Sequence, residues 1–209
     1  HRFSLMTSGA TASTQPFFLL DYLMFYPFVD MDAAGEDQTM DNTVTLPRYT
    51  DGVGVQMIVV AQSGTVGGGR FAITYTGTDD VQYTTESLFC GAAQPSGALV
   101  STSGAVAGLI PFVPLNAGVK GVKNVVSVNF TVANGGLCCV ALVKPLDTSF
   151  VLESTSVAGL GAAVEKEAMR LRGGIVEIKD GAFLGFIGQG VAGSIASSPL
   201  VGTIETIWS

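Results

Sequence analysis

The sequence predicts an all-β protein, and three observations support that prediction. The 27 glycines and 8 prolines fall at intervals along the 209 residues rather than in one run. The segments between them are short and rich in Val, Ile, Thr, Phe and Tyr, which favour extended strands. A similar pattern also occurs twice, in residues 54–73 and 121–140. Many short strands with frequent turns are typical of sandwiches and barrels.

The repeated pattern predicts how these strands connect. Each copy opens with Gly-Val, continues with a β-branched pair and reaches a Gly-Gly at the same offset. Glycine adopts positive φ at little cost, so we expect each copy to be a β-hairpin that turns at its glycines. Two antiparallel ribbons of similar length favour a jelly-roll or Greek-key β-sandwich.

The chain is predicted to have an extended N-terminal arm and one domain. Residues 1–16 are rich in Ser, Thr and Ala without a clear period, which indicates the arm. Residues 17–209 form the predicted single β-sandwich domain, a length that can bury a substantial core.

Most elements of the predicted domain are strands. Those before the second copy are residues 17–30 (one or two strands, divided at Pro27), 43–49, 54–64, 70–77, 81–91 and 98–106. Residues 31–42 between the first two are predicted to be an acidic loop, and Pro47 places the strand over residues 43–49 at an edge or a strand start.

The second copy contains two strands of different character. In residues 122–132 the period-two pattern places Val126, Val128, Phe130 and Val132 on one face. Residues 137–146 are an almost continuous apolar run, which is typical of a strand buried on both faces.

Three further elements follow. Residues 162–172 fit either a short helix or a charged strand. Residues 174–188 predict a hairpin around residues 179–181. The last strand is predicted within residues 194–208, with Ile204, Thr206 and Trp208 on one face.

Charge and hydropathy limit the partners of the chain. The formal net charge is −7 and the pI about 4.5, which argues against a nucleic-acid partner. Apolar residues make up 47% and the mean hydropathy is +0.46. The most apolar stretch, residues 17–28, is too short for a membrane helix and contains Asp21 and Pro27. We therefore expect no membrane span and no signal peptide, and apolar surface that neighbouring subunits cover.

The three cysteines do not form a predicted disulfide framework. Cys138 and Cys139 are adjacent, so a strand would point them to opposite faces, and Cys90 is distant. We expect buried, free thiols in a protein that folds in a reducing cytosol.

Residues that could carry catalysis are sparse. The single histidine is His1, and no G-x-S-x-G motif occurs. The glycine run at residues 64–70 lacks the Gly-Lys-Ser/Thr ending of a phosphate-binding loop. Three carboxylates, Glu86, Glu153 and Glu177, are more readily explained as exposed strand residues than as a glycosidase pair. We predict no catalytic residues and no cofactor.

Two clusters of residues are candidate ligand-binding sites. The first cluster is acidic and comprises Asp30, Asp32, Glu36, Asp37 and Asp41. Its spacing is not that of an EF-hand calcium loop, so a solvated loop is favoured over a metal site. Six aromatic residues favour a buried strand and an interface over a carbohydrate platform; they are Phe17, Phe18, Tyr22, Phe25, Tyr26 and Phe28. Trp208 is expected to anchor the last strand in the core.

Several stretches resemble a widespread group of structural proteins from tailed-bacteriophage virions. They are residues 26–32, 41–56, 114–146, 180–187 and 202–208, together about half of the chain. The resemblance is one of overall pattern and contains no catalytic motif, so it transfers no site residues.

The resemblance implies a structural role. It implies a non-enzymatic capsid decoration (cement) protein of the virion surface, made in the host bacterial cytoplasm. The implied partners are the major capsid protein and further copies of the chain, as a trimer or another symmetric oligomer. A receptor- or glycan-binding sandwich of a tail fibre or spike is the alternative, and a glycan-degrading sandwich is a third hypothesis.

Overall fold

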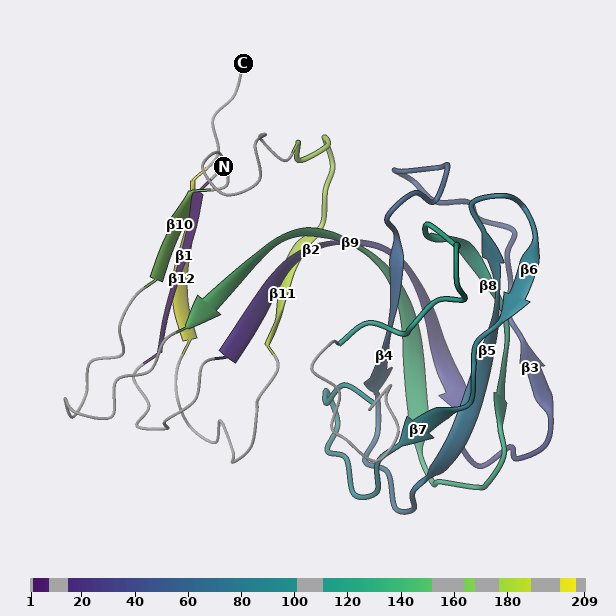
Figure 1. The fold of residues 1–209 in the computed structure, drawn as a ribbon. Helices are drawn as coiled ribbons and strands as arrows, with labels where there is room; N and C mark the ends of the chain where they lie inside the picture. The colour runs from purple at the N-terminus through teal and green to yellow at the C-terminus, as the bar shows by residue number, and fades with distance from the viewer. Residues whose placement is uncertain are drawn as a thin grey trace. The chain divides into compact units, whose positions relative to one another are not determined.

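The computed structural model confirms an all-β protein. It describes residues 2–7, 15–100, 111–151, 164–167, 177–188 and 200–205, and every regular element within them is a strand (Figure 1). None of the described segments is a helix long and apolar enough to cross a bilayer.

The chain divides into two compact units. The first comprises residues 1–21 and 145–209, and the second comprises residues 22–144. Strands β2 (Gln15–Asp30) and β9 (Leu137–Val151) contribute residues to both. These boundaries do not coincide with the predicted arm and domain.

The first unit contains a three-stranded antiparallel sheet in the order β10-β1-β12. Its strands are β10 (Val164–Glu167), β1 (Arg2–Thr7) and β12 (Leu200–Glu205). Part of the predicted arm is therefore a strand, paired with β12 over its whole length. The structure also gives a strand where the sequence fitted either a short helix or a charged strand. Thr206 and Trp208 lie outside the described residues.

Two antiparallel sheets carry the remaining strands. One has the order β11-β2-β9-β4, with β11 at Leu184–Gly188 and β4 at Gln56–Ala61. The other has the order β3-β8-β5-β6, with β7 also paired to β5. Its strands are β3 (Asp37–Thr39), β8 (Val122–Phe130), β5 (Gly69–Gly77), β6 (Gln82–Thr84) and β7 (Leu88–Cys90).

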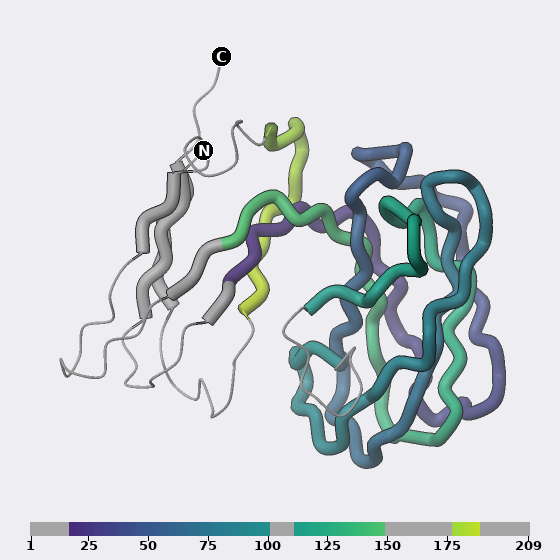
Figure 2. The backbone as a smooth tube through the Cα atoms, viewed as in Figure 1, coloured from purple at the N-terminus to yellow at the C-terminus, as the bar shows by residue number. Residues whose placement is uncertain are grey.

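The predicted hairpins of the repeated pattern are wrong. Strands β4 and β5 of the first copy belong to different sheets, and so do β8 and β9 of the second. The copies pair with each other instead: Ile58 of β4 lies opposite Ala141 of β9, and Phe71 of β5 opposite Phe130 of β8. Figure 1 shows β4 and β9 on one side of the second unit and β5 and β8 on the other. Each copy is thus an arch that crosses between sheets, and Figure 2 follows its path.

The repeated glycines are explained by the close approach of the two arches. A Cβ on Gly121, at the start of the second copy, would lie 2.7 Å from the backbone nitrogen of Gly54, at the start of the first. At the other end, a Cβ on Gly136 would lie 2.8 Å from the carbonyl oxygen of Gly64. Glycine is required there because backbone, not a flexible side chain, occupies the space.

The core of the second unit lies between its two sheets. The rings of Phe71 and Phe130 stack with their centroids 5.2 Å apart. Met57 and Leu142 belong to the same buried cluster from the opposite sheet. The Tyr75 hydroxyl donates to Asn116 Oδ1 and accepts from the Asn116 backbone N–H, both at 2.9 Å, so this buried polar group is satisfied.

Four local predictions need correction. Strand β2 continues through Pro27 without a break, β3 forms inside the predicted acidic loop, and residues 43–49 contain no strand. In β8 Val125 is buried rather than Val126, because the register with β5 shifts between Thr74 and Tyr75. The extra residue of such an irregularity exchanges the faces of the strand. Val132, predicted on the same face, lies beyond the end of β8 and is exposed.

Other predictions are confirmed or changed only in part. Strand β9 is buried on both faces, since Val140, Ala141, Leu142 and Val143 are consecutive and all buried. A turn forms at residues 179–181, where the Ala182 N–H donates to the Lys179 carbonyl. The following strand β11 pairs with β2, and residues 174–176 of the predicted hairpin lie outside the described residues.

Candidate functional site

A groove lies between the second half of β2 and strand β3. Its volume is about 300 Å³, and residues 25–29 and 38–41 line it. Strand β11 pairs with β2 only over residues 17–21, and β3 is the last strand of its sheet. Among the described strands, therefore, both sides of the groove are strand edges of the second unit.

Two phenylalanines are displayed at this groove. Phe25 is 51% exposed and Phe28 is 72% exposed, although Phe17 and Tyr26 of the same aromatic run are buried. The Phe25 ring stacks on Tyr22 with centroids 5.7 Å apart and an interplanar angle of 9°. The run thus divides into core residues and exposed residues, and the predicted interface at the exposed ones stays a prediction.

The backbone at Phe28 has an unusual conformation. Its φ is +61°, in the left-handed region, which costs an L-residue with a Cβ about 1–2 kcal/mol. The Phe28 N–H donates to Gln62 Oε1 at 2.6 Å. Two residues later, Gln38 accepts from the Asp30 N–H at 2.8 Å and donates to the Asp30 carbonyl at 2.6 Å. Side chains from outside β2 therefore hold a strained segment in place, and such strain is concentrated at functional positions.

The floor of the groove is rigid and neutral. The Tyr26 hydroxyl donates to Asn42 Oδ1 at 2.8 Å and accepts from the Val125 N–H at 3.2 Å. Asn42 Nδ2 in turn donates to the Val125 carbonyl at 2.8 Å. Burial raises the pKa of Tyr26, and the Val125 bond offsets this only in part, so the phenol stays protonated at neutral pH.

One carboxylate, Asp41, lines the groove, and four more precede it in the chain. All five carboxylates of residues 30–41 are exposed, and four of them accept a hydrogen bond from within the protein. None of the five is in an ion pair within the described residues. Asp32 accepts from the Gly135 N–H at 2.7 Å and Asp37 from Asn129 Nδ2 at 2.9 Å. The backbone N–H of Thr43 lowers the pKa of Asp41, which lines the groove itself.

These carboxylates do not converge. No group of three or more His, Cys, Asp or Glu side chains in the described part of the chain could hold a metal ion. The hydrogen bonds instead give Asp32 and Asp37 structural roles, since each ties the loop to β8 or to the turn that follows it.

The other candidate residues are Glu86, Glu177, His1 and Glu153. Glu86 is exposed outside a strand, Glu177 is exposed in the other unit, and His1 and Glu153 lie outside the described residues. In the glycine run, the backbone N–H groups of Val66 and Gly67 both donate to the Asn134 carbonyl. Those donors are engaged within the protein rather than directed at a phosphate.

The chain has no match. Neither known protein families, nor curated proteins, nor solved structures are similar to it at a significant level.

Sequence reasoning missed the groove for a physical reason. Strand β3 lies in a stretch that is polar throughout, and nothing in the residue type marks Phe28 as left-handed. The sequence did contain one signal for an exposed strand edge, which is Pro27 within a long apolar strand. Proline within a sheet is confined to edges and bulges.

All three cysteines are free, as expected from the sequence. Cys90 and Cys138 are buried, and Cys138 packs in the core while Cys139 is half-buried outside it. Burial raises the pKa of each thiol.

We expect Cys90 and Cys138 to react with an aromatic disulfide reagent at pH 8 only as fast as the protein opens. A raised pKa lowers the thiolate fraction, and burial excludes the reagent. Mass spectrometry of the time course would locate the label, with the denatured chain as control. Rapid labelling of Cys138 in the folded protein would contradict its burial in the core.

Proposed function

We propose that this protein is a non-enzymatic structural component of a bacteriophage virion, a capsid decoration protein that binds the major capsid lattice. The observation that carries the proposal is the display of Phe25 and Phe28 at a strained edge of the second unit. Exposed apolar groups of this kind mark surfaces that a partner covers. The overall pattern of about half the sequence, which resembles virion structural proteins, motivates the same proposal.

The proposed fold is a jelly roll. Strands β4 and β5 run beside β9 and β8, so the two copies form one antiparallel ribbon that passes from one sheet to the other. A ribbon folded across two sheets is the principle of the jelly roll, which is common in capsid proteins. Symmetric assembly into trimers or another closed oligomer belongs to this proposal.

The proposal is tested by the composition of the particle. Virions of a phage that encodes the chain would be purified by density gradient and their proteins counted by quantitative mass spectrometry. We expect on the order of tens to hundreds of copies per particle, as in other symmetric shells. Absence of the chain from purified virions would overturn the proposal.

A second function is favoured by one observation. The parallel stack of Tyr22 and Phe25 offers an aromatic surface of the kind that sugar rings pack against. A receptor- or glycan-binding protein of a tail fibre or spike would show binding on a glycan array and only a few copies per particle. Many copies without glycan binding would exclude it.

A further inference from the structure

We propose that the groove between β2 and β3 docks an extended polypeptide segment that presents an arginine or lysine side chain. The inference rests on the proposed function, within which the major capsid protein supplies that segment. The inference specifies where the partner binds and which type of side chain is recognised there.

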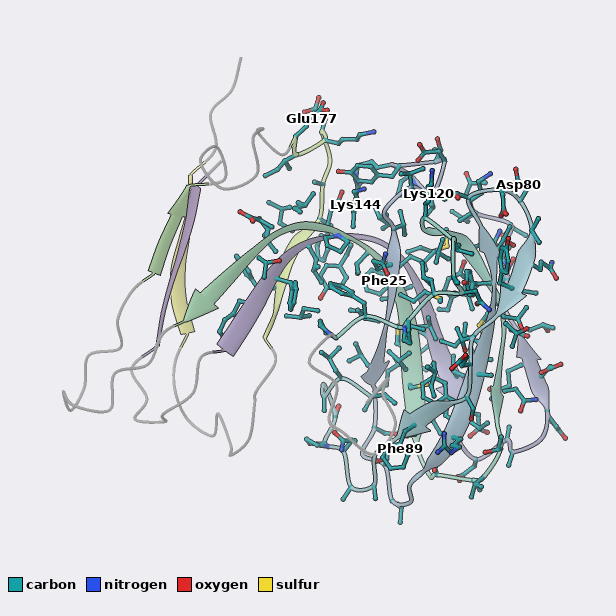
Figure 3. All side chains as sticks on the ribbon, viewed as in Figure 1. Phe25, Asp80, Phe89, Lys120, Lys144 and Glu177 are labelled. Carbon is teal, nitrogen blue, oxygen red and sulfur yellow. The ribbon has the colours of Figure 1, made fainter. Side chains whose placement is uncertain are left out.

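The charge around the groove requires a cationic partner. Five of the carboxylates in the second unit fall within residues 30–41, and within the described residues none of the five is in an ion pair. Four of the five basic side chains of this unit have partners within the protein. Lys123 pairs with Asp80 at 2.6 Å, and backbone carbonyls accept from Lys144, Arg48 and Arg70, while Lys120 is exposed. In Figure 3 Asp80 lies well apart from Phe25. Asp41, which lines the groove and is exposed, is therefore available to a charge from outside.

The exposed rings favour a cation on an apolar stem. Phe25 and Phe28 line the groove, as does Asp41, and the faces of aromatic rings attract guanidinium and ammonium groups. Arginine and lysine combine a long aliphatic stem with such a head group. One side chain can thus cover the rings and reach Asp41, which a small inorganic cation cannot do.

The edges of the groove favour an extended segment held largely by its side chains. The Met40 N–H donates to Val126 of β8, so by strand alternation the backbone groups of Thr39 point away from β8. Thr39 can therefore bond an extended neighbour. On the opposite side Pro27 has no N–H, which prevents a continuous ladder along β2. Recognition accordingly depends on the charged side chain.

The test uses the whole protein and two synthetic peptides. The first is acetyl-Thr-Val-Arg-Val-Thr-amide, and the second replaces its arginine with citrulline, which has the same shape without the charge. Binding would be followed by NMR titration. We expect the arginine peptide to shift resonances of the groove residues and to bind about tenfold more tightly or better than the citrulline peptide.

Variants locate the contact. Phe28→Gly removes the ring and accepts the left-handed backbone, and Asp41→Asn removes one charge; each should weaken arginine-peptide binding about fivefold or more. Val66→Ser and Asp180→Asn are the matched controls, since both residues are exposed and outside the groove, and they should leave binding unchanged. Circular dichroism would verify that every variant is folded.

The outcomes separate the groove from the proposed function. Equal binding of the two peptides, no binding of either, or unchanged binding by the groove variants would overturn the inference. Normal incorporation of Phe28→Gly into virions would also overturn it while leaving the virion role intact. Peptide binding by a chain that is absent from virions would support the groove and overturn the proposed capsid source of the segment.

Discussion

Replacing Phe130 with alanine is expected to lower the free energy of unfolding by about 3–5 kcal/mol. Phe130 is fully buried, lies directly opposite Phe71 in the β5–β8 pair and stacks on its ring. Truncation removes apolar contacts and leaves a cavity between the two sheets, which the surrounding strands fill only in part. Urea unfolding followed by circular dichroism would measure the loss.

The matched control is Phe28→Ala. It removes the same side chain from a position that is mostly exposed, so the loss should stay below about 1 kcal/mol. A similar loss for both variants would contradict the assignment of Phe130 to the core and of Phe28 to the surface.

The local character of the chain was predictable, and the partners of its strands were not. Residue composition and turn residues correctly predicted an all-β protein, the doubly buried β9 and the free cysteines. The glycine turn between β4 and β5 gives the same local signal whether the chain returns in the same sheet or crosses to the other. Only contacts between the distant copies distinguish these cases.

The residue types of the candidate site could be predicted from the sequence, but which of its side chains are exposed could not. The sequence marked the aromatic run and the acidic residues 30–41 as clusters, and the structure brings members of both to one groove. The period-two pattern of β2 could not place them, because the buried positions shift from Leu23 to Tyr26 and again to Val29. The left-handed Phe28 coincides only with the second shift. That conformation is set by Gln62, which is distant in sequence.

The closing prediction concerns the contact between the two arches. Gly121→Ala should lower the free energy of unfolding by about 3 kcal/mol or more, because the added Cβ meets the backbone of residues 52–54 and one strand must move. This contact includes the bridge between Val53 and Gly121 and the bond from the Gly54 N–H to the Lys120 carbonyl. Urea unfolding would measure the change.

Gly118→Ala is the control that separates this crowding from backbone strain. Gly118 has a φ of +86° and nothing within 4 Å of an added Cβ, so its substitution should cost only about 1 kcal/mol. If both substitutions cost the same, the repeated glycines serve only as turns, as the hairpin interpretation required. A much larger cost at Gly121 means that the pattern is repeated because each copy must accommodate the other, so that evolution of one arch is constrained by the backbone of its partner.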